Sequence, residues 1–468
     1  MMSTICAIST AQGGAIGIIR VSGVHSHEIC DKIFKPINGG KSLLDSEMRL
    51  ARYGMIIDYE NGDELIDEVV VICYRGPHSY TGEDSVEIMC HGSSYILQKV
   101  MSQLISNGCT LARPGEYTQR AFLNGKMDLS QAEAVADLIA SSSAATHRLA
   151  MNQMRGGFSE ELRNLRDKLL HLTSLMELEL DFSEEDVEFA DRSEMLSLFG
   201  SIDSTLSHLL DSFKVGNALK NGVPVAIIGE TNVGKSTLLN QLLHEDKAIV
   251  SDIHGTTRDT IEDTIMIDGT LFRFIDTAGI RETNDSIEHI GIERTFKKID
   301  DAQIVLWLID ATNLSNTFTN IRDRLLPHIA DKSLIVVVNK CDLVDETDLY
   351  TAFNDVYEHS GINPDETIFI SAKTGNNISA LESKLNDYTL QNQYGKSDVI
   401  VTNLRHAEAL RQALDSLRRA NETMKDGIST DLVAEDLRLC LNSLGEIVGE
   451  VTNDEVLGNI FSHFCVGK

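Results

Sequence analysis

Proline and positive charge are both scarce in this sequence. Its 468 residues include only six prolines, and almost none fall in the stretch 121–216, so long helices can form there without a break. The 41 Lys and Arg residues are outnumbered by 71 Asp and Glu residues, for a formal net charge of −30. This balance argues against a protein that coats nucleic acid through its overall charge, although it leaves local basic patches or a basic partner open.

Paired cysteines and long apolar runs are also missing. The eight cysteines are scattered, without a CxxC pair or a His–Cys cluster at metal-binding spacing, which predicts free thiols in a reducing compartment. No apolar run approaches the roughly 18 residues of a membrane helix, and the first residues lack the basic and apolar pattern of a signal peptide. We therefore expect a cytoplasmic protein without a membrane segment.

The composition that remains is that of a multidomain globular protein, with 42% hydrophobic and 24% charged residues. In residues 1–120, apolar runs at 15–21, 68–74 and 85–90 predict strands and residues 95–105 predict a helix, so we expect an α+β domain. Several charged residues interrupt these elements. Taken alone, they are typical of solvated loops: Arg20, Glu83, Asp84, Glu87, Arg113 and Glu116.

Long helices are predicted on both sides of the middle of the chain. Residues 121–216 begin with an alanine-rich helical stretch at 128–139, and residues 381–468 again show apolar side chains at helical spacing. We expect these two segments to pack together as one helical domain, with residues 217–380 inserted between them. The positions predicted to face its core are Leu162, Leu165, Leu169, Leu172, Met176, Met195, Phe199, Ile202, Leu206, Leu209, Phe213, Leu410, Leu414, Leu417, Val433, Leu437, Cys440, Leu444 and Ile447.

Residues 217–380 alternate between apolar strand runs and helical stretches. Such alternation predicts a doubly wound, mainly parallel sheet, whose ligands bind at the carboxyl ends of the strands. The strand runs are at 223–228, 271–275, 304–309, 334–338 and 367–370.

The stretch from Gly229 to Ser236, GETNVGKS, follows the first of these strands and opens a predicted helix. In this context the GxxxxGKS pattern forms a phosphate cradle, because its two glycines let backbone N–H groups point inward at the start of the helix. Lys235 would reach the β- and γ-phosphates, and Ser236 would offer its hydroxyl to Mg²⁺. The loop residues assigned to the nucleotide are Asn232, Val233, Gly234, Lys235, Ser236 and Thr237.

Three further motifs follow in the order expected of a GTP site. The DTAG sequence suits contacts to Mg²⁺ and the γ-phosphate. In the NKCD sequence, the Asp342 carboxylate can accept hydrogen bonds from N1 and N2 of guanine, which adenine cannot supply. The SAK sequence suits backbone contact to the guanine oxygen. We therefore expect a Ras-like P-loop GTPase domain with nucleotide contacts at Asp276, Thr277, Ala278, Gly279, Asn339, Lys340, Asp342, Ser371, Ala372 and Lys373.

A polar segment between the first two motifs suits a switch loop, with Thr257 closing on Mg²⁺ when the γ-phosphate is present. Its assigned residues are Ser251, Asp252, Ile253, His254, Gly255, Thr256 and Thr257.

The residue that would orient the attacking water is absent from its usual place. Ras-like enzymes carry a glutamine after the DxxG glycine, whereas this sequence has Ile280. The nearest carboxylates are Glu282, Asp285 and Glu288. Asn232 can hold a monovalent cation at the place where an arginine finger would put its charge.

The whole chain resembles the MnmE (TrmE) family of tRNA uridine-5-carboxymethylaminomethyl modification GTPases, in the Era/TrmE-like group. The likeness rests on the domain order, on the motifs at 113–116 and 124–129, and on the terminal sequence FCVGK. It implies a multidomain α/β fold with an N-terminal α+β domain for folate binding and dimerisation at 1–120. A helical domain then comprises 121–216 and 381–468, and the GTPase domain spans 217–380.

The resemblance also implies a set of site residues. Glu288 would act on the attacking water and, with Lys235, carry catalysis. The implied K⁺ ligands are Asn232, Ser251, Ile253 and Thr256, and the implied Mg²⁺ ligands are Ser236 and Thr257. The implied contacts to 5-formyl-tetrahydrofolate, or a related one-carbon folate, are Arg20, Glu87, Lys126 and Lys468. Cys465 matches the family's terminal cysteine, with a buried structural thiol as the alternative.

As a member of this family, the chain would be a K⁺-stimulated GTP hydrolase that works as a homodimer. It would form a heterotetramer with MnmG (GidA), which supplies FAD. Together they would add an aminomethyl or carboxymethylaminomethyl group to C5 of the wobble uridine of certain tRNAs. The alternative is a GTP-switch factor for ribosome or RNA assembly without modification chemistry. A purely structural protein with an inactive nucleotide site is disfavoured, since Lys235, Ser236, Asp276 and Asp342 are all present.

Overall fold

A computed structural model describes residues 3–11, 13–37, 40–45, 47–59, 62–181, 192–244, 263–275, 300–314, 328–329, 332–357, 367–391, 399–426, 430–452, 454–462 and 464–467. The chain folds as two compact units. One comprises Met1–Ala140, Ala150–Ser204 and Ala409–Lys468, and the other comprises Ser141–Leu149 and Thr205–Glu408. Within the described part of the chain, no helix is both long and apolar enough to cross a membrane.

Seven described strands of the first unit form one sheet in the order β3-β4-β5-β6-β2-β1-β7. Every neighbouring pair is antiparallel except β1 and β7, which run parallel. The strands predicted near 15–21, 68–74 and 85–90 are confirmed as β2, β5 and β6. The bounds are β1 Ile5–Ile8, β2 Ile16–Ser22, β3 Phe34–Pro36, β4 Ala51–Asp58, β5 Glu64–Tyr74, β6 Ser85–His91 and β7 Thr110–Leu111.

The two faces of this sheet differ because side chains alternate along each strand. On β2, Ile19 and Val21 join the core under helices α1 (Ser26–Ile33) and α2 (Ser94–Ser106). Arg20 therefore lies on the opposite face, where Tyr117 of α3 (Glu116–Leu123) packs with residues of β1. The polar side chains of β2 and β6 thus gather on the face that carries α3.

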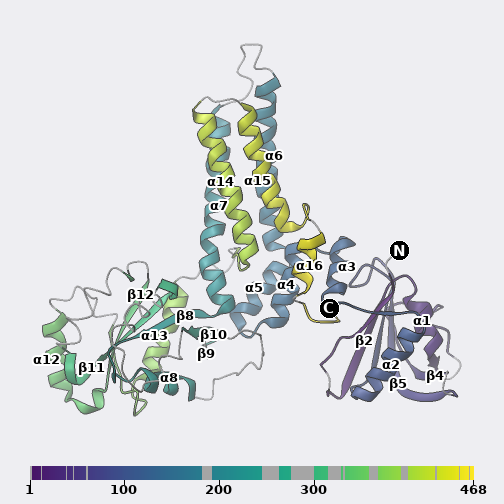
Figure 1. The fold of residues 1–468 in the computed structure, drawn as a ribbon, viewed down its shortest axis with the longest axis horizontal. Helices are drawn as coiled ribbons and strands as arrows, with labels where there is room; N and C mark the ends of the chain where they lie inside the picture. Colours follow the sequence, from purple (N-terminus) through teal and green to yellow (C-terminus); the bar gives the residue numbers. More distant parts are fainter. Residues whose placement is uncertain are drawn as a thin grey trace. The chain divides into compact units, whose positions relative to one another are not determined.

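Four long helices, α6, α7, α14 and α15, lie alongside one another (Figure 1). Arg418 on α14 pairs with Asp203 on α7, and Arg419 on α14 pairs with Asp436 on α15. The prediction that the C-terminal helices pack on the earlier ones is confirmed. Of the predicted core positions only Phe213 is partly exposed; the others are buried. The bounds are α4 Leu129–Ala140, α5 Ala144–Met154, α6 Gly157–Asp181, α7 Arg192–Asn221, α14 Leu404–Lys425, α15 Thr430–Val448 and α16 Asp454–Ser462.

Six described strands of the second unit form the sheet β13-β12-β11-β8-β10-β9. All neighbours are parallel except β9, an antiparallel edge strand that the apolar runs did not indicate. A tight turn at Asp268 and Gly269, both with positive φ, joins it to β10, and Asp-Gly is a favoured hairpin pair. The strand bounds are β8 Val223–Ile228, β9 Asp263–Ile267, β10 Thr270–Phe274, β11 Ile304–Asp310, β12 Ser333–Asn339 and β13 Thr367–Phe369.

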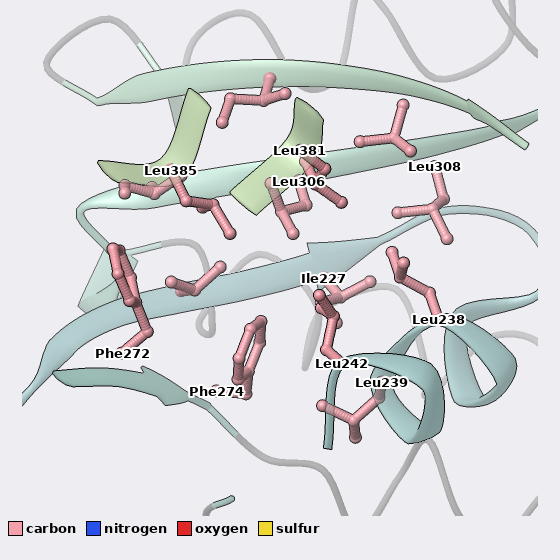
Figure 2. Packing of buried hydrophobic residues seen from close by; sticks show 14 of the residues in the cluster. Ile227, Leu238, Leu239, Leu242, Phe272, Phe274, Leu306, Leu308, Leu381 and Leu385 are labelled. Carbon is pink, nitrogen blue, oxygen red and sulfur yellow. The ribbon is translucent and has the colours of Figure 1, made fainter. Parts of the chain in front are cut away.

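Both faces of this sheet are covered, as expected for a doubly wound fold. Figure 2 shows side chains of α8 (Lys235–His244) and α13 (Ile378–Gln391) packed against one face, around Ile227 and Leu306. The opposite face buries Trp307 and meets α12 (Glu346–Tyr357). Because β8, β11, β12 and β13 are parallel, their carboxyl ends meet at one edge, which is where the sequence motifs lie.

Candidate functional site

The phosphate loop connects the end of β8 to the start of α8, and two glycines shape it. Gly229 has a φ of +153°, and a Cβ there would lie 2.5 Å from the carbonyl oxygen of Leu308. Gly234 has a φ of +98°, and a Cβ there would lie 2.3 Å from Nδ2 of Asn339. Side chains at these positions would be both strained and blocked, so the tight loop depends on glycine.

Lys235 points its ammonium group back into the phosphate loop. Its Nζ donates hydrogen bonds to the carbonyl oxygens of Gly229 and Glu230, both at 2.7 Å. The same residue begins α8, so the ammonium charge and the positive end of a helix converge on the loop, as anion binding requires. Ser236 follows on the first turn of α8, and Asn232 is exposed on the loop with a φ of +64°.

Asn339, at the end of β12, links its own loop to the phosphate loop and to the loop of the SAK motif by hydrogen bonds. Its Nδ2 donates to the carbonyl oxygen of Val233 in the phosphate loop at 2.7 Å. Its Oδ1 accepts from the backbone N–H of Ala372 at 2.9 Å. Asn339 is only 2% exposed, so both ends of its amide are used inside the protein. The phosphate loop and the two predicted guanine motifs are therefore brought together.

The Asp342 side chain is exposed, as a residue that reads a bound base must be. Its Oδ1 accepts a hydrogen bond from Ser371 Oγ at 2.6 Å, which fixes the direction of the carboxylate. Lys373 is exposed beside the buried Ser371 and Ala372. The NKCD and SAK motifs thus form one rim with a carboxylate acceptor held in place.

Asp310 at the end of β11 is a site residue that the sequence motifs did not reveal. Its Oδ2 accepts from Lys340 Nζ at 2.6 Å. Burial pushes the pKa of Asp310 up, but Lys340 and the Thr312 backbone N–H lower it more, so the net pKa is below the usual range. The available signal was its place at the carboxyl end of a strand run. Asp310 holds the long Lys340 side chain across the rim.

The remaining predicted nucleotide residues lie outside the described part of the chain. They are Glu288, the switch residues Ser251, Asp252, Ile253, His254, Gly255, Thr256 and Thr257, and the DTAG residues Asp276, Thr277, Ala278 and Gly279. Lys468, the C-terminal residue of the predicted folate set, also lies outside it.

A pocket of about 240 Å³ opens on the α3 face of the N-terminal sheet. Arg20 and Glu87 face each other across the β2–β6 pair, and the Arg20 guanidinium meets Glu87 Oε1 at 2.8 Å. Two of the four predicted folate contacts therefore share one pocket. It is lined by Arg20, Arg49, Tyr74, His78, Ser79, Tyr80, Thr81, Ser85 and Glu87.

Aromatic rings surround the Arg20 side chain in this pocket. Its guanidinium lies 5.3 Å from the ring centre of Tyr80 and 5.7 Å from that of Tyr117. Burial raises the pKa of Tyr80, so its phenol stays neutral. Lys126 does not line the pocket itself. The Nζ of Lys126 donates to the carbonyl oxygen of Pro77 at 2.9 Å, so this ammonium group contacts the loop that leads into the pocket-lining residue His78.

The expectation that these charged residues, taken alone, lie in solvated loops is wrong for four of them. Glu83, Glu87 and Arg20 are not solvated loop charges, because each is largely buried in an ion pair. Glu116 is only 8% exposed and pairs with Arg120. Arg20 pairs with Glu87 across β2 and β6, and Glu83 pairs with Arg120 on α3, so these ion pairs join distant segments and no local pattern reveals them. Of the same set, Arg113 does remain exposed.

The alternative for Cys465, a buried structural thiol, is also wrong. Cys465 is exposed, six of the other cysteines are buried, and Cys341 is partly buried. No disulfide links the eight cysteines, as the scattered spacing predicted. The thiol at position 465 is therefore open to reagents from solution.

Comparison with known proteins gives consistent results along the whole chain. A family model described as the MnmE helical domain matches residues 129–465, and one described as the GTP-binding protein TrmE N-terminus matches residues 4–126. The tRNA modification GTPase MnmE of Bacteroides fragilis (strain YCH46) is 60% identical over 465 residues, covering 99% of each chain. The protein of the same name from Porphyromonas gingivalis (strain ATCC BAA-308 / W83) is 51% identical over 469 residues, covering 99% of this chain and 98% of the relative.

Proposed function

Because this chain belongs to the MnmE family of tRNA modification GTPases, we propose that it hydrolyses GTP in the course of tRNA modification. The observation that carries the proposal is the double hydrogen bond of Asn339, which joins the phosphate loop to the base-reading motifs. Domain limits of 1–120, 121–216 with 381–468, and 217–380 are part of the proposal.

The geometry of the described residues supports a role for each of them in the proposed nucleotide site. Lys235 exchanges the carbonyl oxygens of its own loop for the β- and γ-phosphate oxygens of GTP. Asp342, aligned by Ser371, accepts hydrogen bonds from guanine N1 and N2. Lys340, held by Asp310, lays its aliphatic stem along the base.

The hydrolysis step would combine described residues with others that lie outside the described part of the chain. Ser236 and Thr257 would hold Mg²⁺, which neutralises phosphate charge when bound. Asn232, with Ser251, Ile253 and Thr256, would hold K⁺ and so supply the charge of an arginine finger. The exposed place of Asn232 on the phosphate loop fits this role. Glu288 would position the attacking water, because Ile280 cannot.

The pocket of the N-terminal sheet would bind 5-formyl-tetrahydrofolate or a related one-carbon folate. Its volume of about 240 Å³ is below the ~300–1,000 Å³ of typical drug-sized sites, so we expect it to enclose only part of the folate. Glu87 would offer a carboxylate to the N–H groups of the folate ring, and Arg20 would meet the oxygens of the folate. Lys126 and Lys468 are proposed as further contacts to the folate.

At the level of the cell, we infer a cytoplasmic homodimer that forms a heterotetramer with a flavin-dependent partner of the MnmG (GidA) type, which brings FAD. The pair would add an aminomethyl or carboxymethylaminomethyl group to C5 of the wobble uridine. The net charge of −30 supports binding of tRNA through local surfaces or the partner rather than through overall charge.

The test is mass spectrometry of wobble nucleosides from cells that lack this gene and carry either the wild type or Lys235→Ala. We expect C5-modified uridine with the wild type and its loss with the variant, since the phosphate-loop ammonium is removed. The control is Lys332→Ala, which removes a lysine bonded to carbonyl oxygens away from the loop. Unchanged wobble uridine in the deletion strain would instead favour a ribosome or RNA assembly factor.

A further inference from the structure

A buried ion cluster lies at the start of α3, apart from the nucleotide site. One terminal nitrogen of Arg120 donates to both Glu83 oxygens, at 3.1 and 3.3 Å, and the other donates to Glu116 Oε1 at 2.8 Å. Arg120 is only 3% exposed, so two carboxylates share one buried positive charge. Arginine can bridge both because its guanidinium is a planar fork, whereas the ammonium of lysine is a single point charge.

One side of this cluster supports the polar pocket. Glu83 Oε2 also accepts from Ser22 Oγ at 2.8 Å, and Ser22 Oγ lies 2.7 Å from Thr81 Oγ1. Thr81 lines the pocket together with Tyr80, whose hydroxyl is 2.8 Å from Thr118 Oγ1 on α3. These contacts are made by three buried side chains, Ser22, Thr81 and Thr118. The segment 75–84 is therefore supported by α3 and β2.

The other side of the cluster supports the C-terminal segment. Glu116 Oε2 accepts the backbone N–H of Arg113 at 2.9 Å and so closes the turn that contains Gly115. Gly115 has a φ of +67°, and a Cβ there would lie 2.6 Å from the carbonyl oxygen of Phe461. Its N–H points to the carbonyl oxygen of Cys465 at 3.4 Å. The turn is thus packed directly against the segment that carries the exposed thiol.

We propose that Arg120 is a positioning residue that holds the polar pocket and the Cys465 segment in register through its two carboxylate partners. Its bond to Glu83 fixes the pocket wall, and its bond to Glu116 fixes the turn under Cys465. Loss of one carboxylate leaves Arg120 with a single charged partner, so the nitrogen that faced the lost carboxylate is buried without its charged acceptor and the structure on that side must rearrange. The proposal rests on the function proposed above only for the identity of the pocket ligand.

The two halves of the cluster can be separated by isosteric substitutions in the full-length protein. Affinity for 5-formyl-tetrahydrofolate is measured by calorimetry, and alkylation of Cys465 by N-ethylmaleimide is followed by mass spectrometry of its peptide. We expect Glu83→Gln to weaken the folate affinity about tenfold and to leave the alkylation rate within twofold. We expect Glu116→Gln to raise the alkylation rate severalfold and to leave the affinity within twofold. Arg120→Lys should change both.

The matched control is Arg418→Lys, which alters an exposed arginine–carboxylate pair on α14 and should change neither property. GTP turnover and the melting temperature report whether each variant is folded. If a variant only lost stability in general, its folate affinity and its alkylation rate would change together. The proposal is overturned if they change together in every variant, or if neither changes in Arg120→Lys. If the wild type does not bind the folate, the proposed ligand is wrong. The alkylation rates of Glu116→Gln and Glu83→Gln still decide the positioning role, because they need no ligand.

Discussion

Asn339 Nδ2 lies 2.7 Å from the carbonyl oxygen of Val233, so a residue of the guanine motif supports the backbone of the phosphate loop. Asn339 also fills the space that a side chain on the next residue, Gly234, would need. The residues predicted to read the base and those predicted to bind phosphate are therefore joined in one hydrogen-bonded assembly. A substitution that disrupts the phosphate loop should therefore also impair the guanine motif, and the reverse should hold as well.

The first prediction concerns Gly234. In Gly234→Ala, the added methyl group would lie 2.3 Å from Asn339 Nδ2 at a φ of +98°, so the hydrogen bond to Val233 must break. We expect GTP affinity to fall at least about 100-fold, as measured with a fluorescent GTP analogue. Gly200→Ala on α7 is the control, because nothing lies within 4 Å of its Cβ. Gly200→Ala should bind GTP with normal affinity, and its free energy of unfolding should rise by about 0.5–1 kcal/mol. Normal binding by Gly234→Ala would contradict the assembly.

The second prediction concerns base selection by Asp342. An amide in Asp342→Asn presents a donor where guanine also presents donors, so GTP affinity should fall about 100-fold or more. Xanthine carries an oxygen in place of the guanine amino group, so xanthosine triphosphate should bind better than GTP to the variant. Competition between the two nucleotides measures this reversal. A variant that still prefers GTP would remove Asp342 from base reading.

The third prediction concerns the monovalent cation. If Asn232 holds K⁺ beside the phosphates, GTP turnover should be about tenfold or more higher in KCl than in NaCl at equal ionic strength. Asn232→Ala should reduce the rate in KCl to the rate in NaCl and leave GTP affinity nearly unchanged. Steady-state phosphate release measures both rates. Equal wild-type rates in the two salts would eliminate the cation role.

The fourth prediction concerns the pocket of the N-terminal sheet. Glu87→Gln removes the charge that faces Arg20 and should weaken 5-formyl-tetrahydrofolate binding by about 10–100-fold, the range of a charge-assisted hydrogen bond. Glu68→Gln is the control, since Glu68 is an exposed carboxylate on β5 that bonds Tyr53 outside the pocket. Titration calorimetry measures the folate affinity of the two variants. Equal affinity of both variants would place the folate elsewhere.

The fifth prediction concerns acid stability. Burial pushes the pKa of Glu116 up, but the Arg113 N–H and the Arg120 guanidinium outweigh it and leave that pKa below its usual range. Its stabilisation is therefore complete above the unfolded pKa of about 4.3 and disappears as pH falls through the lowered folded value. Glu116→Gln should lose about 2 kcal/mol at pH 7 and show a flatter decline below pH 5 in thermal melts. Glu28→Gln, at an exposed pair with His25, should behave as wild type.

Much of the arrangement of the candidate nucleotide site could be predicted from the sequence because its signals are local. Gly229, Lys235, Asn339 and Ser371 each lie at or after the end of an apolar run that becomes a parallel strand. Parallel strands bring such ends to one edge whatever the rest of the chain does. The helical core was predictable for the same reason, since apolar spacing along a helix selects the face that is buried.

The tertiary structure alone decided which charged residues are buried. Glu83, Glu116 and Arg120 resemble surface residues in the sequence, and they become one ion cluster because α3 docks on the outer face of the sheet. Asp310 meets Lys340 only because β11 and β12 are neighbours in the sheet. The free energy of a charge depends on the dielectric and the partners around it, and those are supplied by segments distant in the chain. The motifs therefore predict the chemistry of the candidate nucleotide site, and the packing of distant segments determines the polar pocket and its supports.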